Sequence, residues 1–479
     1  MNKVVILITL CLILYGCSPN DKSAGIPERV TNFVILFADD LGYGDLGPYG
    51  HPTISTPHLD KMANEGMKFT QFYVSAPVCT PSRAGLLTGR YSIRSGLADD
   101  RFSVFFPYSL GGLPQSEITI AEGLKQKDYV TAIFGKWHLG HRPDYLPTKQ
   151  GFDTYFGLPY SNDMSPPTVP FEPLKKLFPP MPLMEGDEIV EEEPDQTQLT
   201  KRYAERAVRF IGEQKDNPFF LYVPFAFPHI PLFASEEFRG KSKRGLYGDT
   251  VEEIDWAVGQ IMDALKTNGV DQNTMVIFIS DNGPWLSKLQ EGGSSGLLRN
   301  GKGSTYEGGQ RVPAIARYPG YIPAGTVSSS LASTLDLFPT IMSMTDIDLV
   351  KDRIYDGYDI TSILKDPNQT VRDEMMYYRG SQLRAIRHGN FKAHFITREK
   401  PYDPNSDEVH HDNPLLYNLN IDPSEQYEIS ADHPDIVEVL ILESEKHKRS
   451  IKPVENQLNK IEPDKLEALL EIYKKYFNK

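Results

Sequence analysis

Three apolar runs that end in polar residues constrain the fold more than any other feature of this sequence. Thr31–Asp40 (TNFVILFADD) and Thr274–Gly283 (TMVIFISDNG) lead into acidic or amide side chains, and Phe219–His229 (FFLYVPFAFPH) ends on a histidine. Continuous apolar runs of this length are typical of parallel strands that are buried on both faces. Because ligands bind at the carboxyl ends of parallel strands, we expect these polar residues to share one site at the edge of a sheet.

Helix-like spacing of apolar residues appears between these runs. It covers Glu117–Lys127, Gln198–Gln214 and the positions from Val251 to Leu265. Strands that alternate with helices predict an α/β fold, in which a large, mainly parallel sheet is flanked by helices. The stretch Ser165–Glu193 is rich in Pro and Glu, and we predict a long loop there that shapes access to the site.

The pattern changes in the last part of the chain. Met375–Phe395 alternates like a short antiparallel hairpin with Gly389 as its turn, and Leu466–Tyr476 has the spacing of a terminal amphipathic helix. We therefore predict a main domain over residues 30–365 and a smaller C-terminal α+β subdomain with antiparallel strands over residues 366–479.

The first residues have the pattern of an export signal. The apolar run Val4–Leu14 is too short to span a bilayer, and it leads into Leu14–Ser18 (LYGCS), which resembles the cleavage box of bacterial lipoproteins. We predict a signal peptide with lipobox over residues 1–17, lipidation at Cys17 and a polar tether over residues 18–29. The protein would then be exported and lipid-anchored in a bacterial cell envelope, facing the periplasm or the cell surface. Secretion without a lipid is the alternative.

The net charge restricts the partners. The chain has 50 Lys and Arg against 64 Asp and Glu, which gives a formal charge of −14. This charge argues against nucleic acid as a partner, since such proteins are usually basic. It also repels polyanions at long range, so an anionic substrate would require a local group of cations.

Cys79 lies in the most distinctive segment of the chain. The chain has three cysteines, and the other two fall in the predicted export segment. The mature domain therefore has no second cysteine with which Cys79 could form an internal disulfide. It begins Cys79–Arg83 (CTPSR), which is followed by Leu87–Arg90 (LTGR). This pattern resembles the Cys-x-Pro-x-Arg signature of the type I sulfatases. Further segments are similar to arylsulfatase A and the related galactosamine-6-sulfatases, in that family's order: Pro107–Leu124, Gly135–Gly140, Gly151–Asp163, Ser280–Pro284, Ser295–Ala314 and Leu416–Ser430.

The resemblance implies an alkaline-phosphatase-like sulfatase fold and a sulfuric ester hydrolase that acts on a sulfated carbohydrate. It implies that Cys79 is oxidised to formylglycine by a formylglycine-generating or an anaerobic sulfatase-maturating enzyme. One hydroxyl of the hydrated aldehyde would attack sulfur, and the second would later lose its proton and expel sulfate. We expect oligosaccharides of a sulfated polysaccharide as substrates, such as algal ulvan or carrageenan, or glycosaminoglycan.

The acidic strand ends also fit a hard metal cation. Asp39, Asp40, Asp281 and Asn282 supply the oxygen ligands that Ca²⁺ and Mg²⁺ prefer. The sequence lacks the His and Cys spacing that would favour zinc. The family usually holds Ca²⁺ there, with Mg²⁺ as the alternative, and the resemblance adds residue Cys79 to the metal shell.

The resemblance also assigns roles to cationic and polar residues. Lys302 and His229 would contact the sulfate and assist the leaving oxygen, His138 would assist the later elimination, and Asp281 would be the base for attack. If the Cys79 segment opens a helix, Arg83 follows one turn later and reaches the same site. The expected catalytic residues are Cys79, Arg83, Lys136, His138, His229 and Lys302, and the expected substrate-binding residues are Lys136, Ser161, His229 and Lys302.

Two other functions stay open at this point. A phosphate or phosphonate ester hydrolase of the same superfamily would keep the fold, although the pair Lys136 and Lys302 favours sulfate. A non-catalytic glycan-binding lipoprotein would not need every catalytic side chain, and all of them are present. Asn300 stands where the animal arylsulfatase A pattern has a cysteine, so a disulfide of those relatives is absent here.

Overall fold

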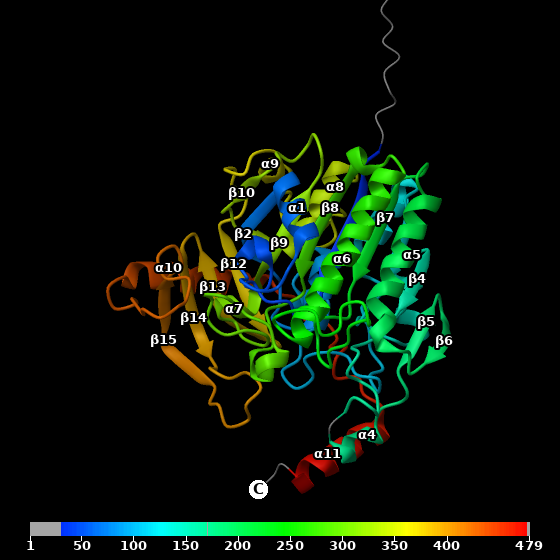
Figure 1. Cartoon of the computed structure of the whole chain (residues 1–479). Helices are drawn as coiled ribbons and strands as arrows, with labels where there is room; N and C mark the ends of the chain where they lie inside the picture. The colour runs from blue at the N-terminus through cyan, green and yellow to red at the C-terminus, as the bar shows by residue number, and fades with distance from the viewer. Residues whose placement is uncertain (1–29, 170, 477–479) are drawn as a thin grey trace, which may run out of the picture. The chain divides into compact units, whose positions relative to one another are not determined.

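A mixed sheet of eleven strands runs through the part of the chain that the computed structural model describes, residues 30–169 and 171–476 (Figure 1). The strand order is β10-β2-β9-β8-β1-β7-β3-β4-β5-β6, with β11 beside β2. The strands are β1 (Asn32–Ala38), β2 (Met67–Tyr73), β3 (Val130–Phe134), β4 (Thr154–Gly157), β5 (Pro182–Glu185), β6 (Glu188–Glu192), β7 (Phe219–Pro224), β8 (Thr274–Ser280), β9 (Arg311–Arg317), β10 (Thr326–Ser328) and β11 (Ala332–Ser333).

The three predicted core strands lie side by side in the middle of this sheet. β1 pairs in parallel with β8 on one side and with β7 on the other, and β7 continues in parallel to β3 and β4. All residues of β1, β7 and β8 are buried. The α/β prediction is confirmed, and the antiparallel strands β9, β5 and β6 make the complete sheet mixed.

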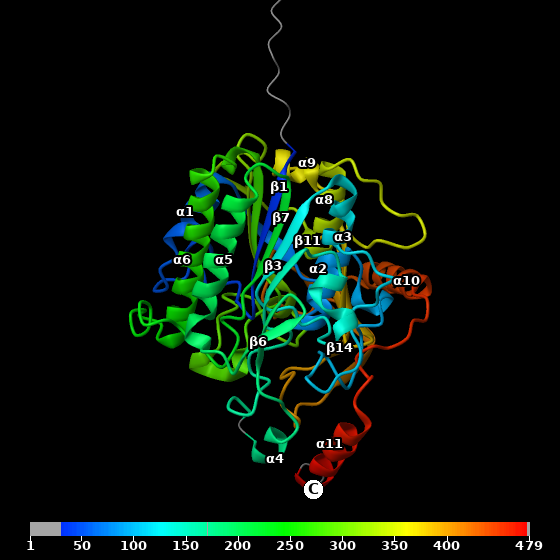
Figure 2. The ribbon, with the colours of Figure 1, turned by 90° about the vertical axis from the view of Figure 1, so that its right-hand side faces the viewer.

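Helices cover both faces of the sheet and create two hydrophobic cores (Figure 2). Because side chains alternate along a strand, Phe33, Ile35 and Phe37 of β1 enter one core, whereas Val34 and Leu36 enter the other. One face carries α1 (Pro57–Glu65), α5 (Leu199–Glu213) and α6 (Leu246–Thr267); the other carries α2 (Cys79–Thr88), α3 (Ile120–Leu124), α8 (Leu337–Met344) and α9 (Thr361–Lys365).

Two of the sequence-based expectations need correction. The helix predicted over Glu117–Lys127 begins only at Ile120, because Thr119 caps it through a reciprocal capping box with Glu122. The loop predicted over Ser165–Glu193 contains the short helix α4 (Glu172–Lys175) and the hairpin β5–β6. The polar sequence near the end of this stretch belongs to an exposed edge strand, because β6 (EIVEE) ends the sheet and carries charged side chains outward.

The C-terminal part forms a second, antiparallel sheet. Its order is β12 (Glu374–Arg379), β13 (Gln382–His388), β14 (Phe391–Thr397) and β15 (Val409–Asn418). The predicted turn at Gly389 joins β13 to β14 with a φ of 55°, and the predicted hairpin is part of this larger sheet. Helix α10 (Pro434–Ser450) packs on β13 and β14, and α11 (Pro463–Tyr476) is the predicted terminal helix.

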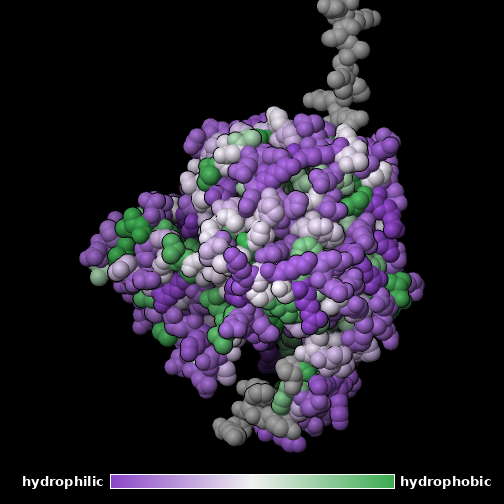
Figure 3. Space-filling model, in the orientation of Figure 1, coloured by the Kyte–Doolittle hydropathy of each residue, from purple (hydrophilic) through white to green (hydrophobic). Residues whose placement is uncertain are grey.

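Among the described residues, no helix has the length and apolar composition needed to cross a bilayer. The face drawn in Figure 3 is mainly hydrophilic, with small scattered hydrophobic groups and a hollow at its lower centre. The predicted signal peptide, the lipidation site Cys17 and the tether lie outside the described residues.

A buried charged cluster joins the two sheets. Lys392 on β14 lies 2.9 Å from Glu307 of the short helix α7 (Glu307–Gln310) and 3.0 Å from Glu425, which also contacts His394 at 2.7 Å. All four side chains are fully buried. Burial acts to raise the pKa of Glu307, but the charges of Lys392 and Arg311 outweigh it and lower this pKa to about 2. The two sheets share an apolar core as well. The boundary at residues 365 and 366 stays a prediction.

We predict that Lys392→Met destabilises the protein by about 3–5 kcal/mol, because it leaves two buried carboxylates without their cation. The measurement is urea unfolding followed by circular dichroism. Lys61→Met is the matched control, since Lys61 is exposed and lies 3.9 Å from Glu65, and it should cost less than about 1 kcal/mol. Equal effects of the two substitutions would contradict the structural role of the cluster.

Candidate active site

The carboxyl ends of the central strands bring the predicted polar residues to one place. Asp39 and Asp40 follow β1, and Asp281 and Asn282 follow β8. The two ends are level, because Ala38 is paired with Ser280 in the ladder and the Asp281 N–H donates to the Ala38 carbonyl at 3.0 Å.

The next two strands in the sheet add a lysine and a histidine to the same edge. Lys136 follows β3, and its N–H donates to the Pro224 carbonyl at the end of β7 at 2.7 Å. His229 lies in the segment after β7, and its Nε2 is 3.7 Å from an Asp40 oxygen. The four neighbouring strands therefore bring carboxylates and basic side chains together along one rim.

Cys79 is the first residue of helix α2 and lies against these strand ends. Its Sγ is 3.5 Å from Asp39 Oδ1 and 3.6 Å from Lys302 Nζ. Burial raises the pKa of the Cys79 thiol far above its usual value, although Lys136 and Lys302 act to lower it. Because the thiolate is the reactive form of cysteine, the unmodified side chain is chemically inert in this position.

Arg83 connects the helix to the carboxylates. As predicted from the spacing, it lies one turn after Cys79 on α2; its Nε and Nη2 donate to Asp281 Oδ2 at 3.1 and 2.8 Å. Its Nη2 is also 3.5 Å from Asp39, and Lys136 Nζ is 2.5 Å from the other oxygen of Asp39. These side chains are fully buried, so each ion pair replaces water that the charges have lost.

The surroundings act differently on the two carboxylates. Burial acts to raise the pKa of Asp39, but the nearby cations, Lys136 first, hold it well below its usual value. Burial and the charge of Asp39 raise the pKa of Asp281 to about 7. A further cation beside this pair would favour the ionised form of Asp281.

The oxygen atoms fit a hard cation. One oxygen each of Asp39, Asp40 and Asp281 lies with Cys79 Sγ in a group whose atoms are within 4.8 Å of one another. The amide Oδ1 of Asn282 is buried and has no hydrogen-bond partner among the described residues, while its Nδ2 donates to Asp40 at 2.7 Å. An unpartnered buried acceptor beside three carboxylates is the donor set expected for Ca²⁺ or Mg²⁺.

The remaining predicted residues lie around the carboxylates and Cys79. Lys302 Nζ lies 2.7 Å from Asp40, and Lys136 Nζ donates to Ser161 Oγ at 3.1 Å. The His229 Nδ1–H donates to the Ile230 carbonyl at 2.5 Å, so the ring carries a proton there and turns Nε2 to the site.

His138 occupies a buried position behind the cations. Its Nε2 bonds to the Phe105 carbonyl at 2.9 Å, and its Nδ1 is buried without a partner among the described residues. Burial and the charge of Lys136 lower the pKa of His138 well below its usual value. The structure thus brings the predicted catalytic, substrate-binding and metal-ligating residues together, while the individual catalytic roles stay predictions.

Two aromatic residues at this site escaped the sequence analysis. The Trp285 ring centroid lies 5.5 Å from that of His229, and Lys302 Nζ lies 4.6 Å above the Trp285 ring. Tyr402, from the loop between β14 and β15, lies 5.2 Å from Trp285. Trp285 directly follows the Ser280–Pro284 segment and is one of only 3 tryptophans in the chain, which was the available signal. Tyr402 had none, because it is distant in sequence.

The family comparisons agree with this site. Residues 31–347 match the family described as Sulfatase, and residues 370–472 match the C-terminal region of aryl-sulfatase. The chain belongs to the sulfatase family. It is 40% identical to arylsulfatase A of Homo sapiens over 443 residues, which is 86% of each chain. It is 39% identical to N-acetylgalactosamine-6-sulfatase of Rattus norvegicus, over 91% of this chain and 89% of that protein.

A solved structure extends the comparison to a carbohydrate complex. Ps i-CgsB in complex with k-i-k-neocarrahexaose is similar to this sulfatase with a TM-score of 0.76 and 29% identity, over 94% of this chain and 99% of the other. The predicted family and sulfatase fold are therefore confirmed, and the protein is a sulfuric ester hydrolase.

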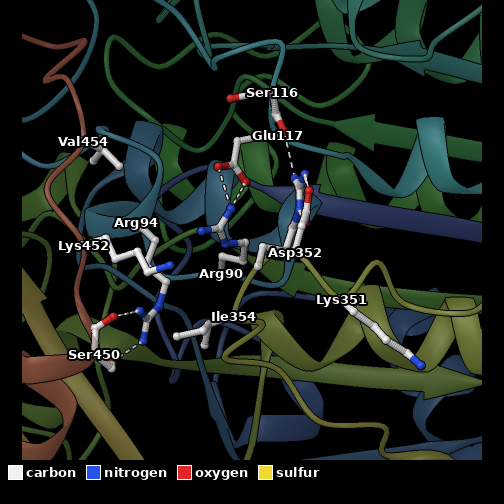
Figure 4. Close-up of a pocket in the computed structure, with 11 residues that line it drawn as sticks. Arg90, Arg94, Ser116, Glu117, Lys351, Asp352, Ile354, Ser450, Lys452 and Val454 are labelled. Carbon is white, nitrogen blue, oxygen red and sulfur yellow. Dashed lines mark hydrogen bonds and ion pairs between the residues drawn. The ribbon is translucent and has the colours of Figure 1, made fainter.

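A cavity outside the active site is lined by arginines that stabilise the fold. It has a volume of about 430 Å³ and is lined by Arg90, Arg94 and Lys351, among others, but by none of the site residues described above (Figure 4). Arg90 of the Leu-Thr-Gly-Arg element donates to both oxygens of Glu117 at 2.7 and 2.8 Å, and Arg94 pairs with Asp356 at 2.9 Å. These arginines hold the end of α2 in place, and their charges are already matched.

We predict that Ca²⁺ raises the melting temperature of this sulfatase and that a chelator reverses the rise. Ca²⁺ at 100-fold excess over its Kd should stabilise the fold by about 2.7 kcal/mol, because it binds the folded carboxylate group alone. Asn282→Ala should weaken Ca²⁺ binding by at least about 10-fold, measured by calorimetric titration.

The matched control for this experiment is Asp45→Asn. Asp45 is also buried beside the strand ends, but it accepts hydrogen bonds from Gly42, Ser294 and Tyr247 and has no part in the carboxylate group. Its variant should keep the full response to Ca²⁺. A melting temperature that does not respond to Ca²⁺ or Mg²⁺ in the parent protein would rule out the metal site.

Proposed function

We propose that this sulfatase removes sulfate from a sulfated carbohydrate through a formylglycine made from Cys79, with Ca²⁺ held by Asp39, Asp40, Asp281 and Asn282. The observation that carries the proposal is the position of Cys79 at the start of α2, between the Asp39 carboxylate and the Lys302 ammonium. A buried thiol with a raised pKa is a poor nucleophile, whereas a hydrated aldehyde at the same carbon offers two hydroxyl groups.

The residues around position 79 divide the chemistry between them. The bound cation would offset charge on the sulfate and nucleophile oxygens. Asp281, whose pKa burial and Asp39 raise to about 7, accepts the proton of the attacking hydroxyl. Lys136 and Lys302 balance the charge of the sulfate oxygens, and Ser161 offers a hydroxyl beside Lys136.

The leaving oxygen needs a proton, and His229 is in position to give it. Burial and the charge of Lys302 lower the pKa of His229 in the free enzyme. A bound sulfate ester brings negative charge beside the ring, which favours the protonated form. His138, whose Nε2 bonds to the Phe105 carbonyl, then assists removal of the proton from the second hydroxyl of residue 79. The loss of this proton expels sulfate.

The proposed substrates are oligosaccharides of a sulfated polysaccharide, of the ulvan, carrageenan or glycosaminoglycan type. A similar sulfatase is known in complex with k-i-k-neocarrahexaose, and a curated relative is named N-acetylgalactosamine-6-sulfatase. The chain charge of −14 favours a short ligand that enters a local cationic site over a long polyanion on the surface. Faster turnover of intact polymer than of oligomers would count against this preference.

We predict that Cys79→Ser lowers sulfate release by at least about 10³-fold, because a serine hydroxyl lacks the second hydroxyl that expels sulfate. The protein is co-expressed with a formylglycine-generating enzyme, the peptide with residue 79 is examined by mass spectrometry, and sulfate release is measured by ion chromatography. Lys302→Met should cost about 10²–10³-fold. Lys351→Met, which changes a lysine at the cavity of Figure 4, is the control and should keep full activity.

A second arm of this assay separates the alternatives. If residue 79 is fully oxidised and metal is bound, but phosphonate esters are cleaved faster than every sulfate ester, the sulfated-carbohydrate proposal is wrong. If Cys79 stays unmodified in the native host, the glycan-binding alternative replaces catalysis.

We also propose that the protein is exported and anchored to a membrane of the cell envelope through a lipid on Cys17, by the lipobox resemblance of Leu14–Ser18. We predict that Cys17→Ala moves the protein from the detergent phase to the aqueous phase of a Triton X-114 extract. Metabolic labelling with an alkyne fatty acid should mark the parent and not the variant. Equal partition of the two proteins would contradict the anchor.

A further inference from the structure

Trp285 and Tyr402 form an aromatic wall beside the sulfate-binding cations. The wall is continuous with the site, because Trp285 contacts both His229 and Lys302, and Tyr402 stands next to Trp285. Backbone hydrogen bonds fix the arrangement: the Lys302 N–H donates to Pro284 at 2.9 Å, and the Gly303 N–H donates to Pro77 at 2.8 Å. The wall therefore stands at a set distance from position 79.

Tyr402 lies flat against the Lys302 segment. A Cβ placed on Gly303 would lie 2.9 Å from two ring carbons and from the hydroxyl oxygen of Tyr402, so the glycine permits this close approach. Tyr402 is nevertheless 39% exposed, and Trp285 is half-buried. An aromatic pair beside the site residues, packed on one side and partly exposed to solvent, offers apolar area to a ligand.

Three arginines contact the loop that carries Tyr402: Arg379 and Arg384 lie on the C-terminal sheet, and Arg398 directly follows β14. Each donates to the loop that carries this tyrosine: Arg379 to the Pro401 carbonyl at 3.4 Å, Arg398 to the Asp403 carbonyl at 2.9 Å, and Arg384 to Glu408. The Nε atoms of all three are buried and have no hydrogen-bond partner among the described residues. Glu408 offsets one of the three positive charges.

Arg379 is poorly compensated in this position. Its hydrogen bond to the Pro401 carbonyl is long, and burial lowers the pKa of its guanidinium; Tyr402 and Glu408 oppose this effect, and Arg384 and Arg398 add to it. A half-buried guanidinium among like charges adds little stability to the fold, and an anion beside it would relieve the repulsion. The cluster is therefore suited to an anionic ligand that the protein does not itself supply.

We propose that Trp285, Tyr402 and the three arginines form a second subsite, which binds a sugar next to the sulfated one and an anionic group on it. The sugar ring packs its C–H face on the aromatic wall, and the anion, a second sulfate or a uronic carboxylate, pairs with Arg379 and its neighbours. The inference rests on the proposed function and makes it narrower: the substrate is an oligosaccharide with acidic groups on successive sugars.

The test measures binding to the full-length Cys79→Ala protein with Ca²⁺, so that no turnover occurs. Calorimetric titration compares four ligands: inorganic sulfate, a monosulfated disaccharide, a disulfated disaccharide and a monosulfated disaccharide that contains a uronic acid. Tyr402→Ala should weaken binding of all three disaccharides by about 10-fold and leave inorganic sulfate unchanged within about 2-fold. Tyr402→Phe should bind like the parent, because the ring face makes the contact.

Arg379→Gln should act on the second charge alone. Binding of the disulfated or the uronate-containing ligand should fall by about 10-fold or more, and binding of the monosulfated ligand should not change. The ligand with the larger loss identifies the anion. The melting temperature without ligand should stay the same or rise in Arg379→Gln, whereas a structural arginine would lower it.

Matched controls lie elsewhere on the surface. Tyr427→Ala removes a tyrosine that is 73% exposed, and Arg353→Gln removes an arginine paired with the exposed Asp352 at the cavity of Figure 4. Neither should change any of the four affinities. Unchanged affinities in these two controls would show that the weaker binding of Tyr402→Ala and Arg379→Gln is not a general effect of removing an aromatic ring or a charge.

Several results would overturn the subsite. One is equal loss for inorganic sulfate and disaccharides in Tyr402→Ala, since the wall would then only position Lys302. Another is an Arg379→Gln protein that binds all ligands like the parent or melts several degrees lower. If the parent binds inorganic sulfate but no sulfated sugar, the proposed substrate class itself fails. Loss of the sugar preference in the variants alone leaves the proposed function intact.

Discussion

The charge balance around three buried carboxylates is the constraint on which the rest of this structure depends. Asp39, Asp40 and Asp281 lie in the dry interior at the ends of β1 and β8, where isolated ionised groups would be very costly. Arg83 from α2, Lys136 after β3 and Lys302 from the segment Ser295–Ala314 each pair with one or two of these carboxylates. The elements that bring these cations cannot move independently, so the ion pairs hold helix and sheet together and also assemble the reaction site.

The same charge balance explains which chemical group suits position 79. The side chain of Cys79 is enclosed by the cations and the carboxylates, and burial there raises the pKa of the thiol. The environment is thus arranged for oxygen atoms and for an anionic ligand, not for a thiolate. The unpartnered Asn282 oxygen and the raised pKa of Asp281 point in the same direction, toward a cation that completes the group.

The C-terminal sheet is part of this arrangement. Through Lys392 and Glu307 it fixes α7, which follows shortly after Lys302, and Asn300 donates to the Glu399 carbonyl at 2.5 Å. This hydrogen bond joins the segment before Lys302 to the loop between β14 and β15 and restrains it. The sheet also carries Arg379 and Arg384, and the loop between β14 and β15 brings Tyr402 next to Trp285, so the C-terminal part belongs to the proposed second subsite.

The sequence by itself determined the main strands, their acidic ends and the nucleophile segment. Buried parallel strands need continuous apolar runs, and Cys79 to Arg83 needs one helical turn, so both are local patterns that can be read in order. The hairpin β5–β6 was missed because an exposed edge strand is nearly as polar as a loop. Tertiary structure alone decided the pKa values at the site, the encounter of Tyr402 with Trp285, and the gathering of Arg379, Arg384 and Arg398. The contact of Tyr402 with Trp285 joins distant segments of the chain, the three arginines meet through the pairing of β12 with β13 and the loop after β14, and the pKa values depend on burial. Neither tertiary contact nor the loss of water is encoded in a short stretch of sequence.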